Sequence, residues 1–244
     1  MSTKELKRLR RREMLAALGA GVGAAITGAC SSSPSSPSST TTTSSGGTSS
    51  STCVVTPSET AGPYPDRTGM INNPAFFRRD ITEGKSGLPL TLTLTIVNVN
   101  NACAPVGGAV VEIWQCDAAG NYSEYSQPGF NGTGLTFLRG LQTTDASGQV
   151  TFNTIYPGWY AGRATHIHVE VFRNGVSVKT TQIAFPESVT AAVYSSGVYA
   201  SKGQNSTSNA GDMVFADGVS NELATLSGST SSGYTATLQI GISA

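Results

Sequence analysis

The sequence predicts an all-β fold, a two-sheet β-sandwich with mostly antiparallel strands, and three observations support this prediction. From Cys53 onward, short runs of alternating apolar and polar residues are separated by Gly, Pro, Asn and Asp, as in strands joined by turns. The 3.6-residue hydrophobic period of a long helix is absent, and so is any internal repeat. Two sheets packed face to face would bury the apolar side of each strand.

Composition divides the chain into three parts. Residues 1–30 resemble an export signal, with a basic stretch, a twin-arginine-like pair at Arg11 and Arg12, and an Ala/Gly-rich run. Small residues precede Cys30, so we expect either lipid attachment at Cys30 or an ordinary soluble secreted protein. Residues 31–52 are almost wholly Ser, Thr, Pro and Gly and predict a disordered linker. Residues 53–244 form the predicted sandwich domain.

The charge balance argues against a nucleic-acid partner. The formal net charge of the whole chain is zero, but removing residues 1–29 leaves nine bases against thirteen acids, a net charge of −4. The signal predicts an exported protein, located in the periplasm, at the cell surface or outside the cell. In an oxidising compartment two of Cys53, Cys103 and Cys116 would pair, and the sequence does not choose the pair.

The predicted strands follow one another through the sandwich domain. Residues 88–98 alternate apolar and polar side chains throughout, as a half-buried strand does. Residues 109–114 form the next strand, with Trp114 expected to pack in the core, and a Gly-Asn loop follows. Residues 149–155 form another strand, preceded by a turn at 145–148.

Three more strands complete the prediction. Residues 166–172 continue the alternating pattern, and Asn174-Gly175 is a hairpin turn signal. Residues 176–185 would therefore return antiparallel. Residues 234–242 close the domain.

The chain contains two histidines, and both fall in one predicted strand as His166 and His168. Residues two apart in a strand point to the same side, so the two imidazoles converge. An isolated pair of this kind is more often a surface or core pair than a metal site. The residues around this pair favour metal ligation instead.

Two tyrosines are the further candidate ligands. Tyr160 lies six residues before His166, and Tyr122 lies in the loop after the strand that ends at Trp114. No carboxylate stands at ligand-like spacing from the histidines, which argues against ferrous iron and zinc. A phenol must lose its proton to bind a metal, and a highly charged ion favours that loss. Ferric iron, Fe(III), is therefore the expected cofactor.

Four segments, 56–64, 108–122, 137–140 and 155–168, carry a resemblance to a known family. They resemble the intradiol ring-cleavage dioxygenases, which include protocatechuate 3,4-dioxygenase and catechol 1,2-dioxygenase. The resemblance covers nearly all of residues 53–244 and is greatest to the secreted, single-chain branch. It implies a β-sandwich enzyme that opens catechol-type rings between the two hydroxyls with O2.

The resemblance also implies a role for each candidate residue. Tyr122 and His166 would stay on the iron, Tyr160 and His168 would be the axial pair, and a water or hydroxide would complete the coordination. A catechol would chelate the iron and displace Tyr160, which leaves with a proton, and the product would be a muconate-type diacid.

Two further residues match the family pattern. Arg163 would be a cation beside the substrate ring, and Gln182 would lie near the oxygen-binding side of the pocket. Their structural alternatives are a solvated salt bridge for Arg163 and an ordinary strand side chain for Gln182.

Two other functions fit parts of the sequence. Segments 108–111, 144–152 and 157–160 are also typical of transthyretin-like and carboxypeptidase-regulatory-like sandwiches, which often only bind a partner. A sandwich that holds copper or zinc through the histidines is a third hypothesis. Neither accounts for Tyr122 and Arg163, so the dioxygenase is the favoured interpretation. The particular catechol and the oligomeric state stay open.

Overall fold

The computed structural model describes residues 53–244, and the predicted export signal (residues 1–30) and linker (residues 31–52) lie outside the described residues. The strands are β1 (Pro89–Asn98), β2 (Ala104–Pro105), β3 (Val110–Trp114), β4 (Ser126–Gln127), β5 (Phe130–Asn131), β6 (Arg139–Thr143), β7 (Gln149–Ile155), β8 (His166–Arg173), β9 (Val176–Ala184), β10 (Thr225–Ser229) and β11 (Gly233–Ile242). The helices are α1 (Glu187–Tyr194) and the short 3-10 helices η1 (Met70–Asn72), η2 (Pro74–Phe76), η3 (Val99–Asn101), η4 (Gly197–Tyr199) and η5 (Asn209–Gly211).

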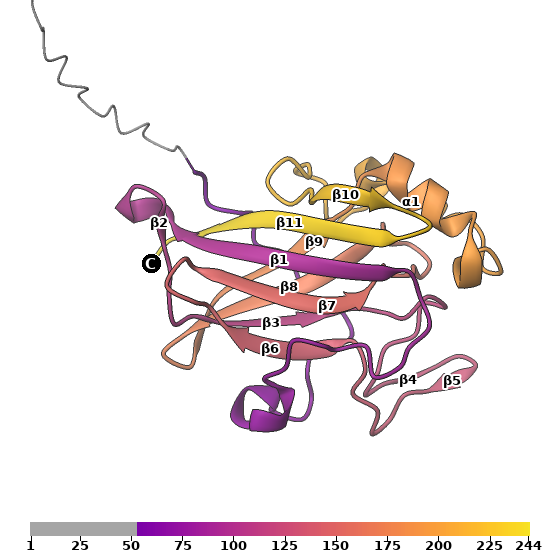
Figure 1. The fold of residues 1–244 in the computed structure, drawn as a ribbon, viewed down its shortest axis with the longest axis horizontal. Helices are drawn as coiled ribbons and strands as arrows, with labels where there is room; N and C mark the ends of the chain where they lie inside the picture. Colours follow the sequence, from indigo (N-terminus) through magenta and orange to yellow (C-terminus); the bar gives the residue numbers. More distant parts are fainter. Residues whose placement is uncertain (1–52) are drawn as a thin grey trace, which may run out of the picture. The chain divides into compact units, whose positions relative to one another are not determined.

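The strands form two packed sheets, which confirms the predicted sandwich (Figure 1). In the first sheet β10, β11 and β1 are neighbours, and β1 pairs on its other side with β7 and, at its end, with β2. The second sheet has the order β6-β3-β8-β9, and β4 pairs with β5 in a separate hairpin. Pairs between these strands are antiparallel except β1 with β11, which run parallel.

The predicted strands match the observed ones closely. The bounds of β7 are those predicted, while β3 begins one residue later and β9 ends one residue earlier than expected. The sequence did not predict β6, β10 or α1. All three elements are short. None of them has the alternation of apolar and polar residues by which the other strands were predicted.

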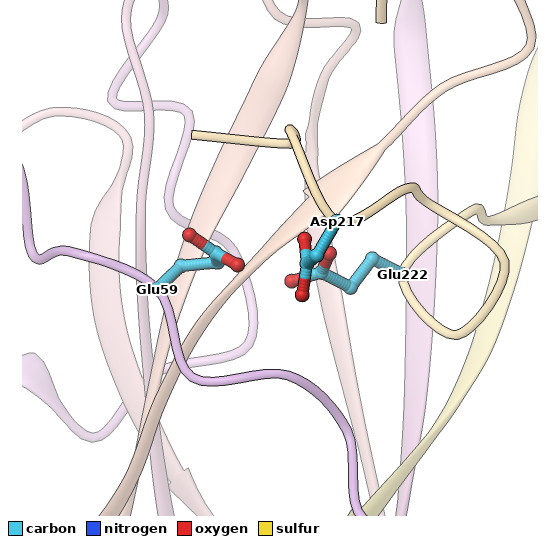
Figure 2. A group of neighbouring side chains, drawn as sticks. All are labelled: Glu59, Asp217 and Glu222. Carbon is cyan, nitrogen blue, oxygen red and sulfur yellow. The ribbon is translucent and has the colours of Figure 1, made fainter. Parts of the chain in front are cut away.

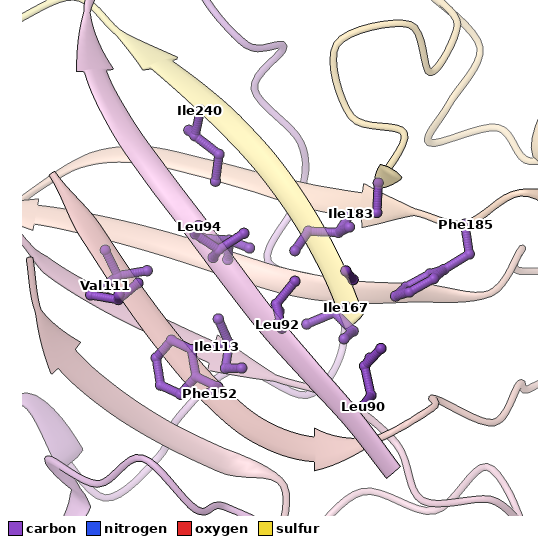
Figure 3. Packing of buried hydrophobic residues seen from close by; sticks show 14 of the residues in the cluster. Leu90, Leu92, Leu94, Val111, Ile113, Phe152, Ile167, Ile183, Phe185 and Ile240 are labelled. Atoms are coloured by element: carbon purple, nitrogen blue, oxygen red, sulfur yellow. The ribbon is translucent and has the colours of Figure 1, made fainter. Parts of the chain in front are cut away.

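The main core lies between the two sheets. Leu90, Leu92 and Leu94 alternate with threonines along β1, and their side chains point toward the second sheet (Figure 3). Val111 and Ile113 of β3 meet them from the opposite side, and the five side chains are at most 1% exposed. Burial of this kind contributes about 1.5–3 kcal/mol for each large aliphatic side chain.

The outer face of the second sheet is covered by an N-terminal strap, residues 59–64. The backbone N–H of Glu59 donates to the carbonyl of Thr180 on β9, and the Tyr64 carbonyl accepts from Arg139 on β6. The strap therefore crosses the sheet from one edge strand to the other. The strap therefore covers the outer face of β8.

A disulfide bond joins Cys53 to Cys103, and Cys116 is a buried free thiol. This settles which of the three cysteines pair. The bond fixes the start of the described chain, ahead of the strap, beside the loop between β1 and β2. None of the helices within residues 53–244 has the length and apolar character needed to cross a membrane.

Candidate metal centre and active site

β8 brings His166 and His168 to the outer face of the second sheet, because the intervening Ile167 points into the main core. Both imidazoles are buried, and their Nε2 atoms lie 3.1 Å apart. Two nitrogens that bind one ion at right angles, each at about 2.1 Å, are separated by about 3.0 Å. The pair is therefore spaced like two neighbouring ligands of one metal ion.

Tyr122 lies in the loop between β3 and β4, and its side chain is fully buried beside the histidines. Its Oη atom is 3.5 Å from Nε2 of His166. The loop begins with a turn in which the Asp117 carboxylate accepts hydrogen bonds from the backbone N–H groups of Ala119 and Asn121. This turn sets the point at which Tyr122 enters the site.

Tyr160 lies in the loop that leads into β8. Its ring centroid is 5.7 Å from that of Tyr122 and 5.6 Å from that of His166. The side chain is only partly buried, whereas the other three predicted ligands are buried. Tyr160 is therefore the predicted ligand that reaches the accessible side of the site.

Arg163 is held beside Tyr160 by two neighbours. Its Nε atom lies 3.0 and 2.8 Å from the two carboxylate oxygens of Asp212, and Nη2 donates to Oε1 of Gln182. Its Nη1 atom is 3.5 Å from Oη of Tyr160, at the outer limit of a hydrogen bond. The Asp212 side chain is fully buried and that of Arg163 is 12% exposed, so this ion pair is not a solvated one.

Gln182 lies on β9 directly across from His168. It is fully buried, accepts the bond from Arg163, and donates through Nε2 to the Thr60 carbonyl at 2.8 Å. The structure thus brings together all six residues predicted from the sequence. Gln182 links the strap to the guanidinium, which is more than an ordinary strand side chain would do.

Asp212 is the residue that sequence reasoning missed. It follows η5 in an irregular loop, and it also accepts a hydrogen bond from the backbone N–H of Ala164, at 2.7 Å. A lone acid in such a loop carries no pattern. Only the fold, by placing this loop beside the one that carries Arg163, shows what Asp212 does.

Trp114 is fully buried in a hydrophobic cluster with Cys116 and Tyr122, as expected of a packing residue, but this cluster is not the main core between the sheets. Glu112 and Trp114 are two residues apart on β3, so they share a face, and that face is the outer one. Instead of packing in the main core, the Trp114 ring stacks on the His168 ring with centroids 4.8 Å apart and planes inclined by 1°. Trp114 therefore fixes the plane of one candidate ligand.

The strap closes over His168 at Gly62. A Cβ atom at this position would lie 2.9 Å from Cε1 of His168, and φ is +69°, a conformation that favours glycine. The Nδ1 atom of His168 is buried without a hydrogen bond of ordinary geometry, although the Thr60 backbone acts to raise the pKa of this ring. Glycine is therefore needed here so that the strap can lie against the imidazole.

The site keeps its imidazoles neutral and its phenols protonated when no cation is near. Burial is the largest cause of the fall in the pKa of His166 to about 3, and it also lowers the pKa of His168 well below the usual value. Burial likewise raises the pKa of Tyr160 to about 12, against the opposing effect of Arg163, and it raises the pKa of Tyr122 well above its usual value. Neutral imidazoles are ready to bind a metal, whereas the phenols need a strong positive charge to ionise.

Comparison with known proteins agrees with this geometry. A family model described as Dioxygenase matches residues 61–204, a range that contains the two tyrosines, the two histidines, Arg163 and Gln182. A solved intradiol ring-cleavage dioxygenase from Tetranychus urticae superposes with a TM-score of 0.70 and is 31% identical, covering 78% of this chain and 95% of that one. The chain belongs to the intradiol ring-cleavage dioxygenase family.

Two curated members of the family are similar over shorter stretches. Catechol 1,2-dioxygenase of Candida albicans is 36% identical over 32% of this chain and 31% of its own length. The protocatechuate 3,4-dioxygenase beta chain of Burkholderia cepacia is 32% identical over 44% of this chain and 51% of its own. The intradiol chain described here thus spans about a third to a half of the length of the curated relatives it matches.

Proposed function

We propose that this chain is a non-haem Fe(III) dioxygenase that cleaves catechol-type rings between the two hydroxyls with O2 and forms muconate-type diacids. The observation that carries the proposal is the convergence of two imidazoles and two phenols beside a fixed guanidinium. Membership of the intradiol family supports the same reaction class.

Tyr122, Tyr160, His166 and His168 would hold the iron. In His166, Nδ1 lies 2.6 Å from the Ala164 carbonyl, which places the ring proton on Nδ1 and leaves the lone pair of Nε2 for the metal. Hard phenolate oxygens fit a ferric ion better than they fit zinc or copper. The raised pKa values of the phenols are consistent with this fit, because the charge of the ion would lower them again.

Ferric iron, when bound, supplies a Lewis acid that ionises the catechol hydroxyls and withdraws electron density from the ring. Tyr160 is placed to accept one of the hydroxyl protons at its Oη atom, because it alone of the four ligands lies on the accessible side. Arg163, held by Asp212 and Gln182, keeps a positive charge beside that oxygen and stabilises the negative charge of the bound substrate. The buried ligands exclude water from the opposite side.

The proposal includes an exported location in the periplasm, at the cell surface or outside the cell. The Cys53–Cys103 disulfide supports it, because such bonds persist in oxidising compartments. Lipid attachment at Cys30 lies outside the described residues and stays a prediction. A chain cleaved before Cys30 and lipidated there would have the mass of residues 30–244 plus that of the lipid, which intact-protein mass spectrometry of the membrane fraction detects.

A visible spectrum of the purified, iron-loaded chain, before and after catechol is added without oxygen, tests the function first. We expect a broad visible band from tyrosinate bound to Fe(III), a shift to longer wavelength with catechol, and release of a muconate-type diacid once O2 is admitted. A colourless iron-loaded chain that consumes no O2 would rule out the proposal.

The variant Tyr160→Phe sharpens this test. Loss of the proton acceptor should lower turnover by about 100-fold or more and weaken the visible band. Tyr156→Phe is the matched control, because Tyr156 is a buried tyrosine of the main core whose hydroxyl contacts Thr190. The control should keep both the band and the turnover.

A further inference from the structure

Three carboxylates gather away from the candidate iron site, on Glu59, Asp217 and Glu222. One oxygen from each lies within 4.8 Å of the others, and Figure 2 shows the three side chains turned toward one another. Glu59 belongs to the strap, and the other two residues belong to the loop before β10. The cluster therefore joins two segments that are far apart in the sequence.

The cluster lies at the edge of β9, where these two segments meet. The strap pairs with the edge through the Glu59 N–H and the Thr180 carbonyl, at 2.9 Å. The loop pairs with it farther along, where the Ala184 N–H donates to the Glu222 carbonyl, also at 2.9 Å. The three carboxylates thus lie where the strap and the loop before β10 meet along the edge strand β9.

Glu222 makes this junction unusual. Its side chain is fully buried, and while Oε1 accepts a hydrogen bond from Thr181 at 2.8 Å, Oε2 has no hydrogen-bond partner. The ion pairs formed by residues 53–244 include none of the three carboxylates. A buried carboxylate oxygen that has no donor and faces two other acids calls for a cation.

The charges around the cluster agree with a doubly charged ion. Asp212 is a fourth carboxylate whose charge acts on Glu59, and Arg163 acts on it with the opposite sign. Lys179 is close enough for the Glu222 charge to raise the pKa of its ammonium, although burial is the larger effect and lowers it. With all four carboxylates ionised, these four negative and two positive groups carry a net charge of −2. The Lys179 Nζ atom donates to the Thr56 carbonyl and to Ser58 rather than to the acids.

We propose that Glu59, Asp217 and Glu222 bind one Ca²⁺ ion, which ties the strap to the loop before β10. Carboxylate oxygens are hard ligands and suit Ca²⁺ better than zinc, which prefers nitrogen and sulfur. Two oxygens on opposite sides of Ca²⁺, each at about 2.4 Å, are about 4.8 Å apart, and the three carboxylate oxygens all lie within that limit of one another. Mg²⁺ demands shorter bonds of about 2.1 Å and a stricter octahedron, so it should bind more weakly.

The site would brace the wall of the candidate active site from behind. Thr60, next to Glu59, accepts the hydrogen bond from Gln182. Asp212, in the same loop as Asp217, holds Arg163. A Ca²⁺ ion between the two segments would thus restrain both residues that position the guanidinium. Its binding does not depend on iron or on ring cleavage.

Calorimetric titration with Ca²⁺ tests the proposal on the full chain, treated with chelator, desalted, and studied both iron-loaded and iron-free. We expect one Ca²⁺ per chain in both forms, a higher melting temperature with Ca²⁺, and a smaller effect of Mg²⁺. Asp217→Asn should weaken Ca²⁺ binding by about tenfold or more, since each lost carboxylate removes ligand charge. Asp217 is exposed, so this variant should fold even where Glu222→Gln fails.

Glu170→Gln is the matched control, because it removes a half-exposed carboxylate from β8 directly across from Thr180. It should leave Ca²⁺ binding unchanged. The opposite result is no heat of binding and a melting temperature that responds to pH but not to Ca²⁺. It would mean that Glu222 is protonated and shares its proton with the other acids, and would overturn the proposal. A chain that binds Ca²⁺ but gives no iron colour would overturn the dioxygenase proposal alone.

Discussion

Arg163 shows how a single loop carboxylate sets the geometry of the candidate site. Its guanidinium has three potential neighbours, and the buried Asp212 takes Nε, which leaves Nη1 facing Tyr160 and Nη2 facing Gln182. The convergence of the two histidines could be predicted from the sequence, because strand alternation alone brings them together. The two tyrosines could be predicted from their positions in the segments that resemble the family. The partner of Arg163 could not, because it depends on where an irregular loop is placed.

Asp212→Asn should lower ring-cleavage turnover by about 10–100-fold while the visible band of the iron-loaded chain persists, because the ligands are untouched. Stopped-flow absorbance and O2 consumption measure the two effects separately. Asp80→Asn is the control, since that carboxylate caps its own surface turn at Thr82. Wild-type turnover in Asp212→Asn would contradict the role given to the ion pair.

Glu112 predicts a pH-dependent change in stability. Burial, followed by the charges of Asp66 and Glu170, raises the pKa of this carboxyl to about 8 from about 4.5. The folded chain then keeps a proton that the unfolded chain loses between these values, so this group destabilises the fold increasingly as the pH rises from about 4.5 to 8. Glu112→Gln should remove the effect.

The gain from Glu112→Gln should be small at pH 5 and a few kcal/mol at pH 9, because one pKa unit corresponds to about 1.4 kcal/mol. Urea unfolding of the variant and the wild type at both pH values measures it. Glu170→Gln, a half-exposed change on the same face, should show a much smaller difference. An equal gain at both pH values would mean that the carboxyl does not titrate as described.

At the scale of the elements, alternation predicted the strands that border the core and failed for the others. β1 alternates apolar side chains with threonine, and β7 and β8 alternate apolar with polar side chains, so the positions of all three were predicted from the sequence within one residue. β6 has one aliphatic residue, and β10 contains a glycine between serines. Trp114 was expected in the core because its strand was taken to alternate between Glu112 and Trp114, but residues two apart share a face, and the register places Trp114 beside His168.

Leu94→Ala tests the core at the middle of β1. The side chain is fully buried between the sheets, so its truncation should cost about 2–5 kcal/mol, partly through the cavity left behind. Thr91→Ala on the outer face of the same strand is the control and should cost about 1 kcal/mol or less. Denaturant unfolding compares the two, and similar losses would argue against the assigned faces.

At the scale of the whole molecule, the disulfide anchors the segment that leads into the strap. The bond joins Cys53 to Cys103, and the chain then runs from Cys53 into the strap that covers His168 and accepts from Gln182. Anchoring its start reduces the freedom of the strap in the unfolded chain and holds it against the sheet.

Replacing both Cys53 and Cys103 by Ser should lower the free energy of unfolding by about 2–4 kcal/mol, as expected for a bond that closes a loop of this length. Thermal unfolding with and without a reductant measures the loss. Cys116→Ser is the control: it removes a buried free thiol and leaves the Cys53–Cys103 bond in place, so reductant should lower its stability as much as that of the wild type. Stability of the double variant equal to that of the wild type would show that the bond does not restrain the strap.

The parallel pairing of β1 with β11 has a consequence for how the molecule is made. Leu90 pairs with Tyr234 and Asn98 with Ile242. The central strand β1 therefore cannot complete its pairing until β11, about a hundred and forty positions later in the chain, has been synthesised. Contacts of such long range are slow to form, because a large loop must close before they stabilise anything. Until β11 arrives, β1 has an unpaired edge that could join another chain. Folding of this domain should therefore be late, cooperative and sensitive to crowding by its own unfinished copies.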